Sequence, residues 1–234
     1  MPAAIYLIPS VLEETATHTI APYIMDAVKN CQVIFAENER SARRFLKSIC
    51  KEIVIDQYEW FAIHKAEAEV LSSFRQKIKE EKQIAVISEA GCPGVADPGQ
   101  LLVEAAQQLN ALVKPLVGPS AVLLALMASG MNGQQFEFVG YLPIDNGERQ
   151  KKIKELELSS EKNKSTKIFI ETPYRNNQLV ETLLKTCKGS TRLCIAASLT
   201  GPDEYIKTKT VADWRKEKTD FHKKPVIFLL QAGS

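Results

Sequence analysis

Short uncharged apolar runs alternate with longer amphipathic stretches along most of this 234-residue chain. In the first half this pattern predicts strands at 4–8, 33–36, 53–55, 84–87 and 112–116, and helices at about 19–30, 41–49, 64–81 and 101–109. Uncharged strands that are each followed by a helix form parallel sheets with both faces covered. The sequence therefore predicts an α/β fold in which the first domain has a mostly parallel sheet.

The second half has apolar runs at 136–140, 167–170, 193–197, 205–211 and 225–230. These runs leave less room for helices between strands, which favours a mixed sheet. Residues 147–167 are rich in charge and are expected to form an exposed helix and loop. Gly118-Pro119-Ser120 is expected to open a helix that ends at Gly130. We place the domain boundary there, which gives two α/β domains at 1–117 and 118–234.

Charge excludes one class of function. The chain has 30 Lys and Arg against 28 Asp and Glu, a formal net charge of +2, whereas a simple electrostatic coat for nucleic acid needs clustered cations. The charge is unevenly divided: residues 1–117 hold 12 basic and 15 acidic residues, and residues 118–234 hold 18 and 13. The basic second half still allows a modest positive face that guides RNA.

Cysteine spacing and the apolar profile indicate the compartment. The five cysteines are widely spaced, with no CxxC pair or Cys/His cluster, so neither a disulfide framework nor a metal site is expected. The start of the chain lacks a basic segment before its short apolar run, and no apolar run reaches about 18 residues. We expect a soluble cytoplasmic protein without a signal peptide, a membrane span or a bound metal.

The most informative segment is SEAGCPGVADPG at 88–99, which follows a buried strand and precedes a helix. Open α/β sheets bind ligands at this position, outside the carboxyl ends of their strands. Its glycines and prolines preset the backbone so that it can hold a small polar ligand. In the alternative interpretation the segment is an ordinary turn in which Asp97 caps the next helix.

The sequence excludes two nucleotide-binding classes. There is no GxxxxGK[ST] motif, and the first strand ends in Pro9-Ser10-Val11-Leu12 without a glycine. A phosphate-binding loop or a dinucleotide-binding turn needs those residues so that the backbone can approach the phosphates.

Four motifs occur in the order found in the tetrapyrrole methylase superfamily: IYLIPS at 5–10, the segment 88–99, PLVGPSA at 115–121 and FVGYLP at 138–143. Three others resemble the branch that methylates a ribose 2′-hydroxyl of small-subunit ribosomal RNA: AENER at 36–40, FIETPYR at 169–175 and PVI at 225–227. The resemblance covers almost the whole chain. It implies a homodimer whose subunits have two α/β domains with S-adenosylmethionine in the cleft between them.

Site residues follow from this resemblance position by position. It implies cofactor contacts from Pro9, Ala90, Gly91, Cys92, Val95, Ser120, Ala121, Glu171 and Leu199. Asp97 also matches a family position, where it would either contact the ligand or cap a helix. The chain departs from the family pattern at Leu12-Glu13-Glu14, which replaces a glycine, and at Leu199-Thr200-Gly201. These departures leave the methyl acceptor open.

Transfer of an activated methyl group to a hydroxyl requires no metal and no covalent nucleophile, but the hydroxyl must lose its proton. A positioned base can contribute about 10²–10⁴-fold to such a reaction. Glu37, Glu39 and Glu89 are the candidate catalytic bases, because they lie at strand ends or in the glycine-rich segment. Arg40 and Arg175 are candidate substrate-binding residues, because a guanidinium binds a phosphate or carboxylate through two hydrogen bonds.

Other conspicuous side chains are expected to be structural. His18, His64 and His222 are scattered over amphipathic or loop sequence and are not expected to be catalytic. Trp60-Phe61 could stack on an RNA base, but aromatic residues near a strand end more often pack into the core.

Three functions remain open from the sequence. The first is an S-adenosylmethionine-dependent methyltransferase for RNA, with the small ribosomal subunit as partner and a ribose 2′-hydroxyl as acceptor. The second is a methyltransferase for a small or porphyrinoid acceptor. The third is a non-catalytic module that binds S-adenosylmethionine.

Overall fold

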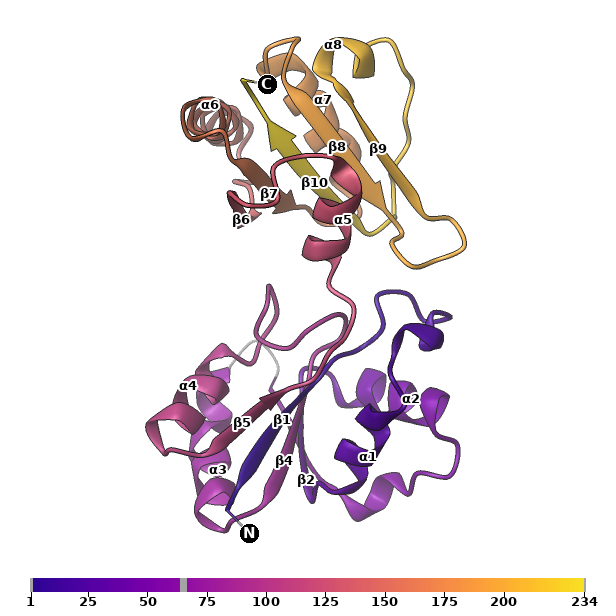
Figure 1. Cartoon of the computed structure of the whole chain (residues 1–234), viewed down its shortest axis with the longest axis vertical. Helices are drawn as coiled ribbons and strands as arrows, with labels where there is room; N and C mark the ends of the chain where they lie inside the picture. The colour runs from indigo at the N-terminus through magenta and orange to yellow at the C-terminus, as the bar shows by residue number, and fades with distance from the viewer. Residues whose placement is uncertain (1, 64–66, 234) are drawn as a thin grey trace. The chain divides into compact units, whose positions relative to one another are not determined.

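The computed structural model describes residues 2–63 and 67–233, and the chain divides into two compact units, Met1–Ser120 and Ala121–Ser234 (Figure 1). The first unit contains a five-stranded sheet in the order β3-β2-β4-β1-β5. Its strands are β1 (Ala4–Ile8), β2 (Val33–Ala36), β3 (Glu59–Ala62), β4 (Gln83–Ile87) and β5 (Leu112–Pro115). All four pairings between neighbouring strands are parallel, which confirms the predicted parallel sheet.

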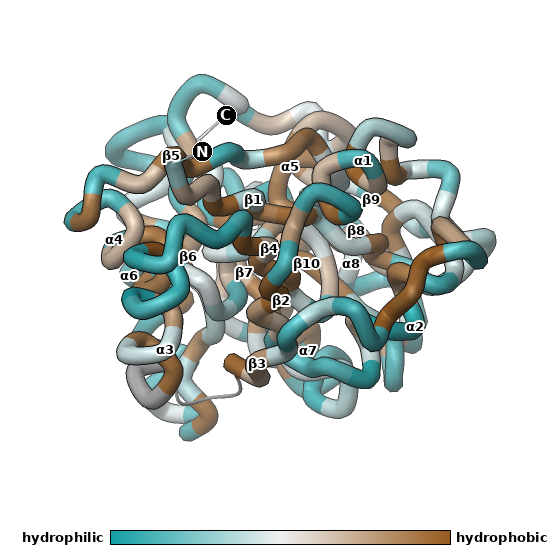
Figure 2. Tube along the Cα trace, turned by 90° about the horizontal axis from the view of Figure 1, so that it is seen from below, coloured by the Kyte–Doolittle hydropathy of each residue, from teal (hydrophilic) through white to brown (hydrophobic). Residues whose placement is uncertain are grey.

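Helices cover both faces of this sheet. They are α1 (Tyr23–Lys29), α2 (Glu39–Ile49), α3 (Glu67–Lys79) and α4 (Gln100–Gln108), with two short 3₁₀ helices at Thr17–Thr19 and Ile55–Gln57. Figure 1 shows α1 and α2 on one face and α3 and α4 on the other. The apolar side chains of β1, β2 and β4 are shared between the two resulting cores, which explains why these strands carry no charge. Figure 2 shows the same contrast, with β2 and β4 brown and α2 largely teal.

The strand predicted at 53–55 is wrong. Ile53 is buried, but Val54 is 60% exposed and Ile55 begins a 3₁₀ helix. The third strand is instead β3, a half-exposed edge strand that pairs with β2. Phe61 of β3 stacks on Phe35 with ring centroids 4.7 Å apart, and the Trp60 indole N–H donates to the carbonyl of Ile55. Both aromatic side chains therefore pack within the protein.

The second unit contains a mixed sheet in the order β6-β7-β10-β8-β9. Its strands are β6 (Phe136–Tyr141), β7 (Thr166–Ile170), β8 (Arg192–Ala197), β9 (Tyr205–Thr210) and β10 (Val226–Gln231). Strands β6 and β7 are parallel, whereas β10 is antiparallel to both β7 and β8, and β9 is antiparallel to β8. This arrangement confirms the predicted mixed sheet.

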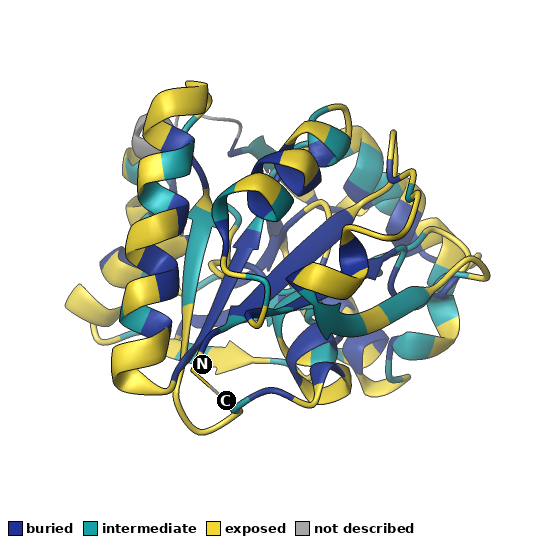
Figure 3. Cartoon of the chain, turned by 90° about the horizontal axis from the view of Figure 1, so that it is seen from above, coloured by how far each residue is buried: buried dark blue, intermediate teal, exposed yellow. Residues whose placement is uncertain are grey.

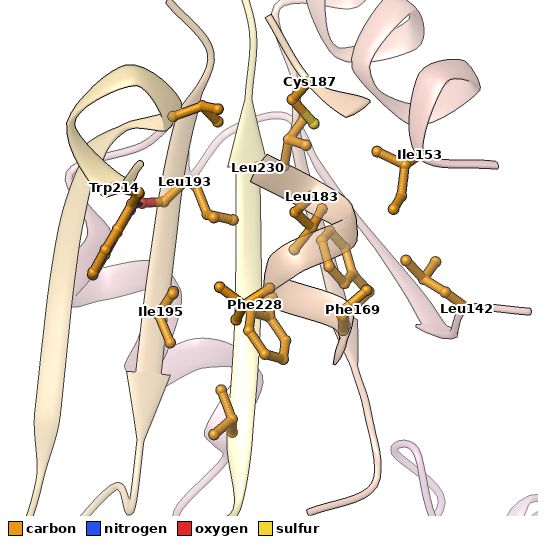
Figure 4. Close-up of a cluster of buried hydrophobic side chains, with 14 of the residues drawn as sticks. Leu142, Ile153, Phe169, Leu183, Cys187, Leu193, Ile195, Trp214, Phe228 and Leu230 are labelled. Carbon is orange, nitrogen blue, oxygen red and sulfur yellow. Dashed lines mark hydrogen bonds between the residues drawn. The ribbon is translucent and has the colours of Figure 1, made fainter. Parts of the chain in front are cut away.

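Four helices accompany this sheet: α5 (Ala121–Ser129), α6 (Asn146–Asn163), α7 (Asn176–Thr186) and α8 (Val211–Trp214). Figure 4 shows the core, in which Phe169, Phe228 and Leu193 of the sheet lie beside Leu183 of α7 and Trp214 of α8. Helix α5 ends at Ser129, directly before the predicted stop Gly130, and packs against β9 and β10.

The charge-rich segment 147–167 is only partly exposed, contrary to expectation. Helix α6 buries one side through residues that include Ile153, Leu156 and Ser160, and exposes the opposite side. Figure 3 shows this pattern for the helices in general, with dark blue inner sides and yellow outer sides. The lysines and glutamates conceal an apolar period of three to four residues. Among the described helices, none has the length and hydropathy needed to cross a bilayer.

Candidate functional site

The candidate site of the first unit lies where β1, β2, β4 and β5 end, because parallel strands place their carboxyl ends at one edge of the sheet. There the loop after β4 is tied to the loop after β1. The Ser10 N–H donates to the Gly91 carbonyl at 2.8 Å, and the Gly91 N–H donates to the Ser10 carbonyl at 3.2 Å. The buried Ser10 hydroxyl also donates to the Ser88 carbonyl at 2.8 Å. The two loops are therefore held in a defined register.

The segment after β5 approaches the first loop even more closely. A Cβ atom on Gly118 would lie 2.1 Å from Cβ and 2.4 Å from Cγ of Pro9, so only glycine fits there. The Cys92 thiol lies 3.5 Å from the carbonyl oxygen of Pro119. The structure thus brings together three predicted cofactor residues, Pro9, Gly91 and Cys92, with the segment that leads to Ser120.

Residues 91–99 form a loop whose backbone is fixed by its own hydrogen bonds. The Gly94 N–H donates to the Pro98 carbonyl and the Val95 N–H to the Cys92 carbonyl, both at 3.2 Å. Ala96 has a φ of 66°, an uncommon value for a residue with a side chain. The side chain of Val95 is 49% exposed. A loop fixed in this way presents its backbone to a ligand at little cost in conformational entropy.

Carboxylates gather beside this loop. The Glu89 N–H donates to a carboxylate oxygen of Glu37 at 2.9 Å, and the Ser41 hydroxyl donates to the Glu89 carboxylate at 3.0 Å. Burial raises the pKa of Asp97 from 3.8 to about 7, and the negative charges of Glu37 and Glu89 add to this shift. The structure therefore brings together two of the three candidate bases, with Asp97 beside them.

The remaining charged candidates of this region lie on α2. Glu39 forms an ion pair with Arg43 at 3.6 Å. Arg40 is exposed and forms no ion pair with another described residue. Sequence reasoning did not anticipate Ser41, although its position three residues after the N-cap Asn38 marks it as part of the first helical turn.

The prediction that Asp97 caps the following helix is wrong. Gly99, not Asp97, is the N-cap residue of α4. Asp97 is instead a partly buried carboxyl group with a pKa near neutrality, a property that suits proton transfer. The sequence did contain a signal, since Asp97 is the only charged residue between Glu89 and Glu104.

The raised pKa of Asp97 predicts a specific dependence of stability on pH. Between pH 3.8 and about 7 the folded state keeps a proton that the unfolded chain has lost, so the free energy of unfolding falls as the pH rises through this window. We expect Asp97→Asn to be more stable than the wild type by about 1–2 kcal/mol at pH 8, after discounting for partial exposure, with the difference vanishing towards pH 4.

Urea unfolding at pH 5, 6, 7 and 8 measures this difference, with Glu104→Gln on the exposed side of α4 as the control. A stability difference that stays constant from pH 5 to pH 8 would contradict the assignment.

In the second unit, the predicted site residue Glu171 is almost fully buried, with a side chain that is 1% exposed. Its Oε1 accepts hydrogen bonds from Arg175 at 2.6 and 3.0 Å and from the Thr172 N–H at 2.7 Å. Its Oε2 is buried without a hydrogen-bond partner among the described residues. Two nitrogens of Arg175 are thereby engaged by Glu171, and substrate binding by Arg175 stays a prediction.

The predicted site residue Leu199 lies in the loop between β8 and β9. Its neighbours Ser198 and Thr200 have φ values of 51° and 68°, a left-handed conformation that costs non-glycine residues of order 1–3 kcal/mol each. The Thr200 hydroxyl is also buried without a partner among the described residues. Strained backbone and unpaired buried polar atoms are typical of ligand sites.

Two of the three histidines lie in the described part of the chain. His18 is in the 3₁₀ helix Thr17–Thr19, and the ring of His222 packs edge-on against Tyr174 with centroids 5.8 Å apart. His64 lies outside the described residues.

Comparison with known proteins identifies similar chains. The family described as Tetrapyrrole (Corrin/Porphyrin) Methylases matches residues 16–214. A protein of Buchnera aphidicola named ribosomal RNA small subunit methyltransferase I is 30% identical over 98% of this chain and 78% of its own length. A protein of the same name from Vibrio cholerae is 34% identical over 74% of this chain, and the match spans 60% of that relative.

Two solved structures show the same fold at low sequence identity. The methyltransferase CobJ superimposes with a TM-score of 0.65 and 16% identity, covering 98% of this chain and 93% of that one. Uroporphyrin-III-C-methyltransferase from Thermus thermophilus superimposes with a TM-score of 0.58 and 14% identity, covering 99% and 93%.

Proposed function

This chain belongs to the tetrapyrrole (corrin/porphyrin) methylase family, and from that premise we propose that it transfers the methyl group of S-adenosylmethionine to RNA of the small ribosomal subunit. When bound, S-adenosylmethionine supplies a methyl group that is already activated by its sulfonium charge. The protein must then hold both partners in line, exclude water and accept the proton of a hydroxyl acceptor.

The observation that carries the proposal is the close junction of three loops at the carboxyl ends of β1, β4 and β5. Ser10 and Gly91 pair through their backbones, and Gly118 abuts Pro9 where no side chain fits. This leaves a preset backbone surface around Ala90, Gly91 and Cys92 for a small polar ligand. We propose that these residues, with Pro9, Val95, Ser120 and Ala121, bind the cofactor.

The second unit offers two further contacts. The buried Oε2 of Glu171 lacks a partner among the described residues, and a hydroxyl or amino group of a ligand would supply one. Leu199 is a buried apolar residue held between two left-handed residues of a strained loop. We propose that Glu171 and Leu199 also contact the cofactor.

We propose that a carboxylate group beside the glycine-rich loop accepts the proton of the acceptor hydroxyl. Glu37 and Glu89 remain candidate bases, and Asp97 joins them because its pKa lies near neutrality. Glu39 is the weakest of the original candidates, since it is paired with Arg43 on the surface of α2.

Two observations favour RNA as the acceptor. The similar proteins from Buchnera aphidicola and Vibrio cholerae are named as ribosomal RNA methyltransferases. Residues 118–234 also hold 18 basic against 13 acidic residues, which favours approach of a polyanion. The solved structures of CobJ and of uroporphyrin-III-C-methyltransferase show the fold alone, so they do not favour a small acceptor.

We further propose a homodimer in the cytoplasm. All five cysteines are free thiols, which suits a reducing compartment. Light scattering should give twice the mass of the 26.1 kDa chain, and a monomeric mass would refute the dimer.

The function is tested with labelled S-adenosylmethionine, first by titration and then by incubation with small-subunit particles or with protein-free total RNA. We expect saturable cofactor binding and label in small-subunit RNA. The labelled nucleotide should resist alkaline hydrolysis, because a methylated 2′-oxygen cannot attack the neighbouring phosphate. Label only in a low-molecular-weight fraction would refute the RNA acceptor, and saturable binding without transfer would indicate a non-catalytic binding module.

A further inference from the structure

A pocket of about 480 Å³ lies in the first unit, and its lining includes the candidate base Glu89. The proposed function has not yet placed a ligand in this pocket. The pocket opens between the loop after β1 and the side of α2 that carries Ser41, Arg44, Phe45 and Ser48. Glu89 and Ala90 of the glycine-rich loop form one wall. A group held in this pocket therefore lies against the loop that carries the candidate base Glu89. The volume of the pocket is in the range of small-molecule sites.

Apolar side chains form part of the pocket lining. Val11 and Leu12 come from the loop after β1, and Phe45 comes from the buried side of α2. Leu12 belongs to the segment Leu12-Glu13-Glu14, which departs from the family pattern, and it adds apolar surface to the lining. Such a surface favours a flat, weakly hydrated group such as a nucleobase.

The polar groups of the pocket disfavour a phosphate inside it. The Ser41 hydroxyl is already donated to the Glu89 carboxylate, and the guanidinium of Arg44 is paired with Glu14 at 2.5 Å. The negative charges of Glu89 and Glu14 would repel a phosphate in the pocket. Hydroxyl and amino groups, in contrast, can donate hydrogen bonds to these carboxylates. Arg40, which is exposed and has no ion pair among the described residues, precedes Ser41 and remains available to a phosphate outside.

A second hollow lies on helices α1 and α2. This hollow, of about 530 Å³, also has Ser48 in its lining and extends along α1 to Asp26 and Lys29. Ser48 lines both hollows, so a chain molecule bound in one lies close to the other.

We propose that this pocket binds the acceptor nucleotide as an unpaired residue of RNA, with its base on Val11, Leu12 and Phe45 and its ribose toward Glu89. The inference rests on the proposed RNA methyltransferase function and adds to it the place where the acceptor binds.

Filling the pocket tests this assignment. Ser48 is exposed, and among the described residues its hydroxyl bonds only to the Phe45 carbonyl of its own helix, so Ser48→Trp should fold normally. We expect the KM for RNA to rise by at least about tenfold, while cofactor affinity stays within about twofold. Lys47→Trp is the matched control, since Lys47 is the exposed neighbour outside the pocket lining, and it should leave both quantities unchanged.

The outcomes separate this inference from the proposed function. An unchanged KM for RNA in Ser48→Trp, with an active wild type, would overturn the pocket assignment alone. An equal loss of cofactor affinity would overturn it in favour of a cofactor pocket. A wild type that binds the cofactor but transfers no label to any RNA would refute the proposed function and the inference together.

Discussion

Gly118→Ala is expected to weaken S-adenosylmethionine binding by about 100-fold, equivalent to about 2.7 kcal/mol. The added methyl group would lie 2.1 Å from Cβ of Pro9, and neither the proline ring nor the backbone on either side can rotate away from it. The segment 118–120 and the loop after β1 would have to separate, and both carry proposed cofactor contacts. Isothermal titration calorimetry measures the affinity, and circular dichroism verifies that the variant is folded.

Two further variants make this result specific. Gly133→Ala is the matched control, because nothing lies within 4 Å of the atom that it adds. The double variant Pro9→Gly with Gly118→Ala removes both ring atoms that the new methyl group would meet, so it should recover affinity to within about tenfold of the wild type. Wild-type affinity in Gly118→Ala alone would show that the junction of the three loops does not form the cofactor site.

Arg175→Met is expected to lower the free energy of unfolding by about 3 kcal/mol. It leaves the Glu171 carboxylate without its counter-charge in a position that is 1% exposed, where it already has an unpartnered oxygen. This expected loss of unfolding free energy is at the lower end of the range for removing one partner of a buried ion pair, because the Arg175 side chain is 28% exposed. Urea unfolding at neutral pH measures it.

The control for this prediction is Lys185→Met, which breaks an ion pair between side chains that are 78% and 70% exposed. It should cost no more than about 0.5 kcal/mol. The double variant Glu171→Gln with Arg175→Met should be more stable than Arg175→Met alone, because no buried charge remains uncompensated. Equal losses in Arg175→Met and Lys185→Met would contradict the buried pair.

Periodicity predicted most of the elements because the strands of the first unit are buried on both faces. The runs at 4–8, 33–36 and 84–87 carry no charge and match β1, β2 and β4 closely. The method failed at β3, where a half-exposed edge strand contains Glu59 and the nearby apolar run forms a 3₁₀ helix instead. It also failed to identify α7, although Leu179, Val180 and Leu183 give this helix an apolar side.

For the candidate site, the sequence predicted the loop but not the electrostatics within it. The segment 88–99 was recognisable from its glycines and prolines and from its place after a buried strand. The electrostatic environment of Asp97 was not recognisable from the sequence, because a carboxyl group just before a helix is ordinarily expected to cap it. Only the folded loop shows that Asp97 lies near Glu37 and Glu89, which come from different strand ends.

What the sequence determined by itself was therefore the class of fold and the position of the glycine-rich loop proposed to bind the cofactor, since both depend on local patterns of burial and backbone freedom. The tertiary structure decided which distant residues meet: Gly118 with Pro9, Ser41 with Glu89, and Leu12 with Phe45 in one pocket. The physical reason is that a parallel sheet brings loops from separate parts of the chain to a single edge. Their contacts depend on strand order and register, which no local pattern encodes.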